Sequence, residues 1–141
     1  MRNQAGDLLI VKPAYRDGWL LPGGICERNE APATTLVREV HEELGIEARI
    51  VGLLCVDYLS AHDGYDESLH FLFQCDPISP DEVDRIRLPP DELVDLRFCP
   101  DAAANELLVP TIARRLRSLE QPRGGAAVYL QNGVDPSRPF G

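Results

Sequence analysis

Strand-like and helix-like spacings of apolar residues follow one another along the first third of the chain. Residues 8–12 (LLIVK) form a short β-rich run that Pro13 closes. Between Pro32, which suits the first turn of a helix, and Gly45, which suits the left-handed position after its last turn, apolar residues recur at helical spacing. This stripe consists of Leu36, Val37, Val40 and Leu44. The pattern therefore predicts a strand, a break and an amphipathic helix.

Downstream of this helix the pattern returns mainly to strands. The predicted strands cover residues 48–59, 68–75, 84–88, 94–99 and 127–131. An acidic loop at residues 60–67 separates the first two, and helical segments begin near Asp101 and at Pro110. This order predicts one mixed α/β domain over residues 1–141, with residues 122–141 as its C-terminal tail.

The length and the charge of the chain narrow the functions that it could have. At roughly 100–200 residues per domain, 141 residues leave room for one domain. The formal net charge is −9, which argues against sequence-independent binding to nucleic acid or to an anionic membrane, because both require clustered Lys and Arg. If such an acidic chain binds phosphates, a metal ion is the expected source of positive charge.

Cysteine spacing and the N-terminal residues indicate a cellular location. The four cysteines lack Cys-x-x-Cys spacing, which favours reduced and mostly buried thiols over a zinc or redox site. Residues 1–7 lack the apolar region of a signal peptide, and no apolar run reaches membrane-spanning length. We therefore expect a cytoplasmic protein without a membrane partner.

Three carboxylates project from one side of the predicted helix, away from its apolar stripe. Glu39, Glu42 and Glu43 are close enough along the helix for their charges to repel one another. A solvated acidic face would explain them, and so would a site for a hard divalent cation such as Mg²⁺, which binds carboxylate oxygens and substrate phosphates. Spacing alone leaves both interpretations open.

The residues around these carboxylates resemble a known signature. With x for any residue, the string is Gly24-x5-Glu30-x7-Arg38-Glu39-Val40-x-Glu42-Glu43-x-Gly45-Ile46. It matches the Nudix box of the Nudix hydrolases at each defined position over residues 24–46. The resemblance implies an α/β/α sandwich with a mixed sheet, in which a loop–helix–loop binds Mg²⁺ or Mn²⁺ and a diphosphate.

The resemblance also implies which residues hold the metal. Glu39, Glu42 and Glu43 match the catalytic, metal-binding carboxylates of the family, and the carbonyl oxygen of Gly23 matches a backbone ligand. The implied reaction is attack by a metal-activated water on a phosphoanhydride bond of a nucleoside diphosphate linked to another group.

Other positions of the box match residues with structural roles. Gly24 and Gly45 match its glycines, and Glu30 and Arg38 match a buried ion pair that joins the loop to the helix. An exposed ion pair is the alternative for Glu30 and Arg38. A buried and an exposed pair differ in their effect on stability, because removing one partner is far more destabilising when the pair is buried.

Two candidates lie outside the box. Glu92, six residues before Phe98, resembles a loop glutamate of mutator-type members that acts as a base or an extra ligand. An ordinary loop charge is the alternative for it, and Asp63, Asp66, Glu67, Asp91 and Asp95 compete for the role. Lys12 is the only lysine and ends the first predicted strand, where related enzymes often place a cation on the substrate phosphate. An ordinary strand-end cation is the alternative.

The chain departs from the family at its N-terminal end. Nudix domains normally have a strand before the one at residues 8–12, and residues 1–7 are too polar to be a convincing strand. Either that strand lies upstream of this sequence, or another segment replaces it. Residues 127–131 have the composition to do so, within the chain or exchanged in a homodimer.

The substrate is less well specified than the chemistry. Residues that distinguish ADP-ribose, diadenosine and coenzyme A hydrolases are mostly missing or displaced. We expect a small nucleotide substrate, such as a nucleoside triphosphate or a nucleotide sugar. A catalytically silent Nudix-fold module that binds a nucleotide is the alternative.

Overall fold

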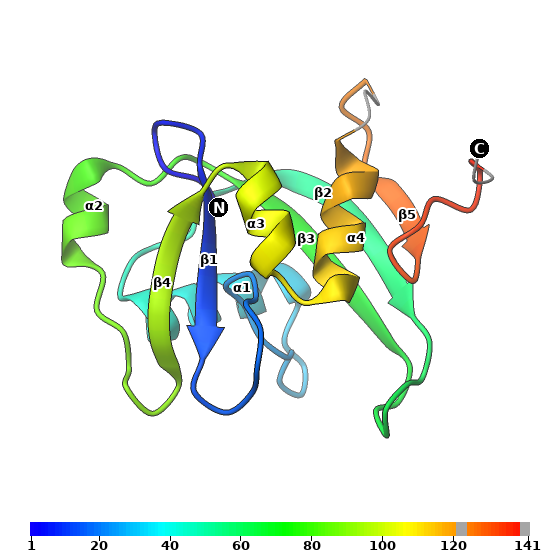
Figure 1. Cartoon of the computed structure of the whole chain (residues 1–141), viewed down its shortest axis with the longest axis horizontal. Helices are drawn as coiled ribbons and strands as arrows, with labels where there is room; N and C mark the ends of the chain where they lie inside the picture. Colours follow the sequence, from blue (N-terminus) through cyan, green and yellow to red (C-terminus); the bar gives the residue numbers. More distant parts are fainter. Residues whose placement is uncertain (121–123, 139–141) are drawn as a thin grey trace.

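The middle layer of the molecule consists of two sheets lying side by side (Figure 1). The computed structural model describes residues 1–120 and 124–138. Its strands are β1 (Leu8–Pro13), β2 (Ile50–Leu59), β3 (Ser68–Cys75), β4 (Leu93–Cys99) and β5 (Val128–Gln131). β1 pairs antiparallel with β4, whereas β2 lies between β3, which is antiparallel to it, and β5, which is parallel.

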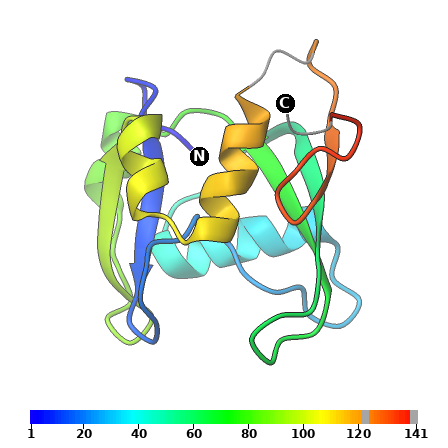
Figure 2. The ribbon, with the colours of Figure 1, turned by 45° about the vertical axis from the view of Figure 1, so that its right-hand side comes forward.

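Helices cover both sides of this layer. They are α1 (Pro32–Leu44), α2 (Pro80–Arg85), α3 (Asp101–Leu107) and α4 (Pro110–Leu119). Figure 2 shows α1 on one side of the two sheets and α3 and α4 on the other. The α/β/α sandwich with mixed strand directions is therefore confirmed. In the described part of the chain, no helix is long and apolar enough to cross a membrane.

β1 contributes to a hydrophobic core on each of its faces. Leu9 and Val11 pack in one buried cluster with Val40 and Leu44 of α1. The alternate residues Leu8 and Ile10 belong to a second cluster, together with Ala104, Leu108 and Ala113 from the opposite layer. Because successive strand residues point to opposite faces, the four apolar residues that begin β1 fix α1 relative to α3 and α4.

Two local predictions are wrong. Residues 84–88 are not an edge strand, because α2 occupies Pro80–Arg85. A capping box starts this helix: the Ser79 hydroxyl accepts a hydrogen bond from the backbone N–H of Glu82, and the Glu82 carboxylate accepts one from the backbone N–H of Ser79. In α1, Val37 is 36% exposed rather than part of the core. Thr35 is buried in its place.

The strand predicted at residues 127–131 is confirmed as β5, but it does not lie beside β1. It pairs with β2 in the same chain, with Cys55 opposite Val128 and Tyr58 opposite Gln131. Residues 122–123 and 139–141 of the predicted tail lie outside the described residues.

A buried ion pair fastens the tail to the second sheet. The Arg115 Nε of α4 donates to the Asp57 Oδ2 of β2 at 2.8 Å, and both side chains are less than 5% exposed. The backbone N–H of Gly133 donates to the other oxygen, Asp57 Oδ1, at 2.9 Å. One carboxylate therefore joins β2, α4 and the turn after β5.

We predict that Arg115→Met strongly destabilises the fold, because it leaves the Asp57 carboxylate buried without its cation. Losing one partner of a buried pair costs about 3–5 kcal/mol. Urea unfolding would measure the difference, with Arg117→Met, on an exposed position of the same helix, as the matched control expected to stay within about 0.5 kcal/mol of the parent. Equal unfolding free energies for the two variants would contradict the interpretation of this pair.

Candidate active site

A glycine turn leads from β1 to α1 and brings the backbone against two helix carboxylates. Gly23 has a φ of 141°, which side-chain-bearing residues rarely adopt, and its N–H donates to Glu43 Oε2 at 3.1 Å. A Cβ atom on Gly24 would lie only 2.2 Å from Glu39 Cδ. Glycine at position 24 is therefore what allows the Glu39 carboxylate to pack on the turn.

Arg38 connects the loop before α1 with the helix itself. Its Nε and Nη2 donate to the two carboxylate oxygens of Glu30 at 2.8 and 2.9 Å, a bidentate arrangement. Its Nη1 donates to Glu39 Oε1 at 2.9 Å and to Glu42 Oε2 at 3.1 Å. The Arg38 and Glu30 side chains are 25% and 12% exposed, so the pair is half-buried.

Glu30 is held from several directions. Besides Arg38, the Thr35 hydroxyl donates to Glu30 Oε2 at 2.8 Å, and the backbone N–H of Glu27 donates to the same oxygen at 3.0 Å. The Arg38 hydrogen bonds, followed by the Glu27 N–H, lower the pKa of Glu30 to about 2. The sequence analysis did not predict that Thr35 binds Glu30. Its position three residues before Arg38, on the same helix face, could have indicated this role.

The pKa of Glu43 is shifted in the opposite direction to that of Glu30. Burial, together with the charges of Glu39, Glu92 and Glu42, raises the pKa of Glu43 to about 7 against the lowering effect of the Gly23 N–H. The influence of Glu92 is informative, because this residue lies about fifty positions further along the chain. The fold thus brings the loop before β4 close to the carboxylates of α1.

A backbone contact holds the Glu92 loop beside the end of β1. The carbonyl oxygen of Glu92 accepts a hydrogen bond from the N–H of Ala14 at 2.9 Å, and the Glu92 side chain itself is exposed. This connection explains how a residue far from the box reaches the site. In the sequence, only the resemblance of Glu92 to a loop glutamate of the family pointed to this position, because its spatial proximity depends on the long-range pairing of β1 with β4.

Lys12 is not brought into this cluster. It is exposed and lies opposite Asp95 in the β1–β4 ladder. By strand alternation it follows Leu8 and Ile10, which face α3 and α4, whereas α1 packs on the other face of β1. Among the interactions of residues 1–120 and 124–138, none joins Lys12 to a carboxylate of the box.

The carboxylates suit a divalent metal chemically but do not enclose a site as they stand. In the part of the chain that the structure describes, no three His, Cys, Asp or Glu side chains are grouped so as to hold an ion. The Nη1 of Arg38 contacts two of the three helix carboxylates instead. Because that single nitrogen makes both contacts, the carboxylates could be released to a cation while the bidentate pair with Glu30 remains.

Known proteins identify the family of this chain and share its fold. A family model described as the NUDIX domain matches residues 1–119. The human diphosphoinositol polyphosphate phosphohydrolase 3-alpha is 43% identical over 49 residues, which cover 35% of this chain and 30% of the human protein. The match thus spans less than a third of that relative's length.

Two solved structures extend the likeness to the whole fold. A MutT protein from Methanosarcina mazei has a TM-score of 0.72 at 17% identity, over 84% of this chain and 86% of its own. A Caenorhabditis elegans Ap4A hydrolase has a TM-score of 0.64 at 20% identity, over 84% and 89%. An α/β/α sandwich carrying an intact box defines the class, and the chain belongs to the Nudix family.

We predict that Glu43→Gln stabilises the metal-free protein at alkaline pH. The pKa of Glu43 in the folded state is about 7, above its ordinary value of 4.5, so the folded protein favours the protonated acid. Stability is therefore lost as the pH rises from about 4.5 through 7, and the glutamine variant escapes this loss. Thermal melts in a chelator should show a higher Tm for the variant at pH 8 and similar values at pH 4. The control variant Glu47→Gln should show the same dependence of Tm on pH as the parent. If Glu43→Gln also showed this dependence, the interpretation would be contradicted.

We predict that Arg38→Ala lowers Tm at neutral pH, because Glu30, Glu39 and Glu42 all lose their shared donor. The pKa of Glu30 is depressed in the folded state, so its contribution is present above about pH 4.5 and is lost as the pH falls toward 2. The difference in Tm from the parent should narrow over that range. Arg28→Ala, on an exposed residue of the same loop, should melt like the parent. A variant as stable as this control would show that the half-buried pair contributes little.

Proposed function

We propose that the chain hydrolyses a phosphoanhydride bond in a small substrate that carries a nucleoside diphosphate linked to another group. Family membership supports this reaction, and one observation carries it: the charges of Glu39, Glu42 and Glu92 act together on Glu43 beside the Gly23 backbone. A bound cation relieves mutual repulsion of this kind, so the carboxylate cluster is suited to bind one.

Mg²⁺ or Mn²⁺ would be held by Glu39, Glu42 and Glu43, with the carbonyl oxygen of Gly23 as a further ligand. A bound ion of this type polarises phosphoryl oxygens and lowers the pKa of a coordinated water. The chain contributes the orientation: Gly24 admits Glu39 to the turn, and the Gly23 N–H fixes one oxygen of Glu43. Arg38 then holds the loop to the helix through Glu30.

We assign proton transfer to Glu92. The charge of this residue helps to raise the pKa of Glu43. Glu92 is exposed, so its carboxylate can exchange protons with solvent. A pKa of about 7 allows Glu43 to hold or release a proton near neutral pH when no metal is bound. Asp91 and Asp95 flank the same loop and provide comparison residues.

Charge composition favours nucleotides over more highly phosphorylated substrates. The human relative is named for diphosphoinositol polyphosphates and the nematode structure for Ap4A, so both names refer to diphosphate-containing compounds. Recognition of several phosphates requires several Lys and Arg side chains. This chain has 14 Lys and Arg residues against 23 Asp and Glu, a net charge of −9, and Arg38 is already engaged by carboxylates. A nucleoside triphosphate or a nucleotide sugar is consistent with this charge composition. We also propose a cytoplasmic location for the protein.

A phosphate-release screen over nucleoside triphosphates and nucleotide sugars, with Mg²⁺ and with Mn²⁺, tests the proposal. We predict that millimolar metal raises Tm by binding the folded state, and that Glu42→Gln removes most of this rise. The same variant should lose at least about 100-fold in turnover, because it lacks a metal-binding carboxylate. Glu47→Gln, on an exposed residue just after α1, should retain both properties.

The outcomes of this screen separate the alternatives. Full turnover by Glu42→Gln at saturating metal would contradict the metal assignment. Tight binding of a nucleotide without turnover by the parent would instead identify a silent binding module. Glu92→Gln should lower kcat and alter the acidic limb of the pH profile, whereas Asp91→Asn should change neither if Glu92 is the base.

A further inference from the structure

The family match ends before β5 and the turn that follows it. The NUDIX model covers residues 1–119, whereas the structure also describes residues 124–138, which we call the C-terminal arm. Leu130 of this arm is fully buried, and Gly133 is buried with its N–H on Asp57. The C-terminal arm is therefore built into the fold although it lies outside the matched domain.

The C-terminal arm is tied to the start of the loop that joins β2 to β3, residues 60–67. The backbone N–H of Asn132 donates to the Tyr58 carbonyl oxygen at 2.7 Å. The Ser60 N–H donates to Asn132 Oδ1 at 2.9 Å, and Asn132 Nδ2 donates to Ser60 Oγ at 3.0 Å. One asparagine thus holds both the backbone and the side chain of the first loop residue.

A continuous set of contacts leads from Ser60 to the tip of this loop. The Ser60 carbonyl oxygen accepts a hydrogen bond from His62 Nδ1 at 2.9 Å. His62 and Tyr65 exchange two backbone hydrogen bonds around Asp63 and Gly64, whose positive φ values are those of a tight hairpin turn. The rings of His62 and Tyr65 have centroids 6.0 Å apart, and Tyr65 is 69% exposed. The position of the tip therefore depends on Ser60, and through it on the C-terminal arm.

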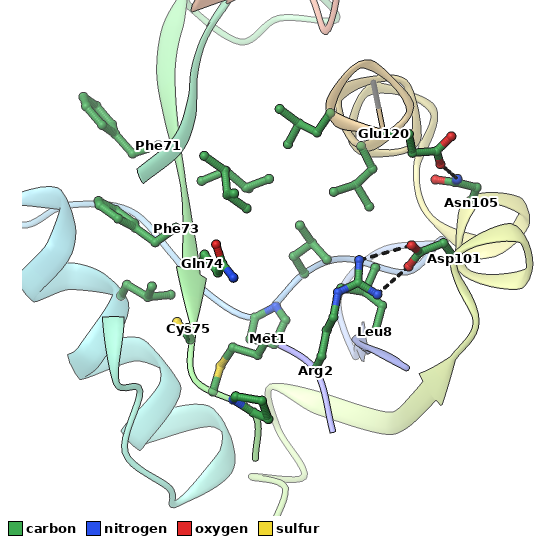
Figure 3. Close-up of a pocket in the computed structure, with 18 residues that line it drawn as sticks. Met1, Arg2, Leu8, Phe71, Phe73, Gln74, Cys75, Asp101, Asn105 and Glu120 are labelled. Atoms are coloured by element: carbon green, nitrogen blue, oxygen red, sulfur yellow. Dashed lines mark hydrogen bonds and ion pairs between the residues drawn. The ribbon is translucent and has the colours of Figure 1, made fainter. Parts of the chain in front are cut away.

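The loop receives its support from one side of the second sheet. In the part of the chain that the structure describes, Asn132 provides the hydrogen bonds that reach residues 60–67 from outside the β2–β3 hairpin. On the other side, β3 borders a cavity of about 420 Å³, with Phe71 and Gln74 among its lining residues (Figure 3). None of the residues that line this cavity belongs to the loop. Loss of the Asn132 contacts would therefore leave the loop without a replacement anchor.

The loop lies at the end of the molecule that carries the candidate active site. Figure 1 and Figure 2 both show it at the lower end, together with residues 24–30 of the box and the loop before β4. It contains the carboxylates of Asp63, Asp66 and Glu67 and no Lys or Arg. Because these charges repel phosphates, the loop suits an uncharged part of a substrate rather than its diphosphate.

We propose that Asn132 is a positioning residue that holds residues 60–67 as a wall of the substrate site, against an uncharged part of the substrate. This inference rests on the proposed function and adds the C-terminal arm to the elements that determine specificity. The uncharged part is either the nucleoside or a sugar attached to its diphosphate. In both cases the wall contributes to binding of that part, whereas the diphosphate is left to the residues of the box.

Amide exchange in two variants tests whether Asn132 holds the loop. Asn132 has a φ of 52°, so Asn132→Gly removes the side chain without straining the backbone. Gln131→Ala is the matched control, because the Gln131 side chain donates to the Tyr129 hydroxyl rather than to the loop. The Tyr65 amide does not contact Asn132, and it should exchange at least about tenfold faster in Asn132→Gly and at the parent rate in the control. Equal rates in both variants would overturn the proposal.

Calorimetry in Mg²⁺ tests whether the loop is a wall of the site. The probes are methylene-bridged analogues that cannot be hydrolysed at the diphosphate: methylenediphosphonate, the analogues of ADP and UDP, and those of ADP-ribose and UDP-glucose. Asn132→Gly should bind methylenediphosphonate like the parent and the nucleotide sugar analogue at least about fivefold more weakly, because an unheld loop must be ordered on binding. Weaker binding of the nucleoside diphosphate as well would identify the nucleoside as the part at the wall, and its unchanged binding would identify the sugar.

Two results of the calorimetry would overturn the wall. They are equal affinities of parent and variant for each probe, and equal weakening for all of them, methylenediphosphonate included. If the parent bound none of the probes, the proposed function and the wall would fail together. The exchange measurement would still decide whether Asn132 holds the loop, so the two failures can be told apart.

Discussion

The bidentate ion pair between Arg38 and Glu30 is the contact on which the geometry of the site depends. It fixes an irregular loop to the first turns of α1, and the remaining nitrogen of the same guanidinium reaches Glu39 and Glu42. A lysine would provide a single ammonium without the planar fork needed for these simultaneous contacts. The loop, the glycine turn and the carboxylates are therefore positioned together rather than one by one.

Local parts of the fold could be predicted from the sequence, and parts that depend on distant residues could not. The helix between Pro32 and Gly45 follows from spacing and end signals within fourteen residues, and the structure has it at Pro32–Leu44. α2 was missed because Ser79 and Glu82 cap a short helix that ends at Arg85, just before the strand-like spacing of Ile86 and Leu88. The β5 segment was identified correctly, but its partner was not, because strand composition does not specify which edge it pairs with.

The same division holds for the candidate site. The carboxylates of the box were predicted because their spacing is local, whereas the proximity of Glu92 to Glu43 depends on the pairing of β1 with β4. The buried Asp57 and Arg115 were not predicted at all. A lone aspartate within an apolar strand was the available signal, and it becomes interpretable only when its partner on α4 is known.

The placement of β5 has a consequence for synthesis of the protein on the ribosome. β2 and β3 form a hairpin of neighbouring strands, but the Gly133 N–H that satisfies Asp57 belongs to a segment translated 76 residues after it. Until that segment emerges, the nascent hairpin carries an aspartate whose final partners do not yet exist, next to an open strand edge. Contacts at such separation form late, since the entropy of closing the intervening loop must be overcome first. The second sheet is thus completed only when β5 has emerged, and until then its open edge is exposed to association with other chains.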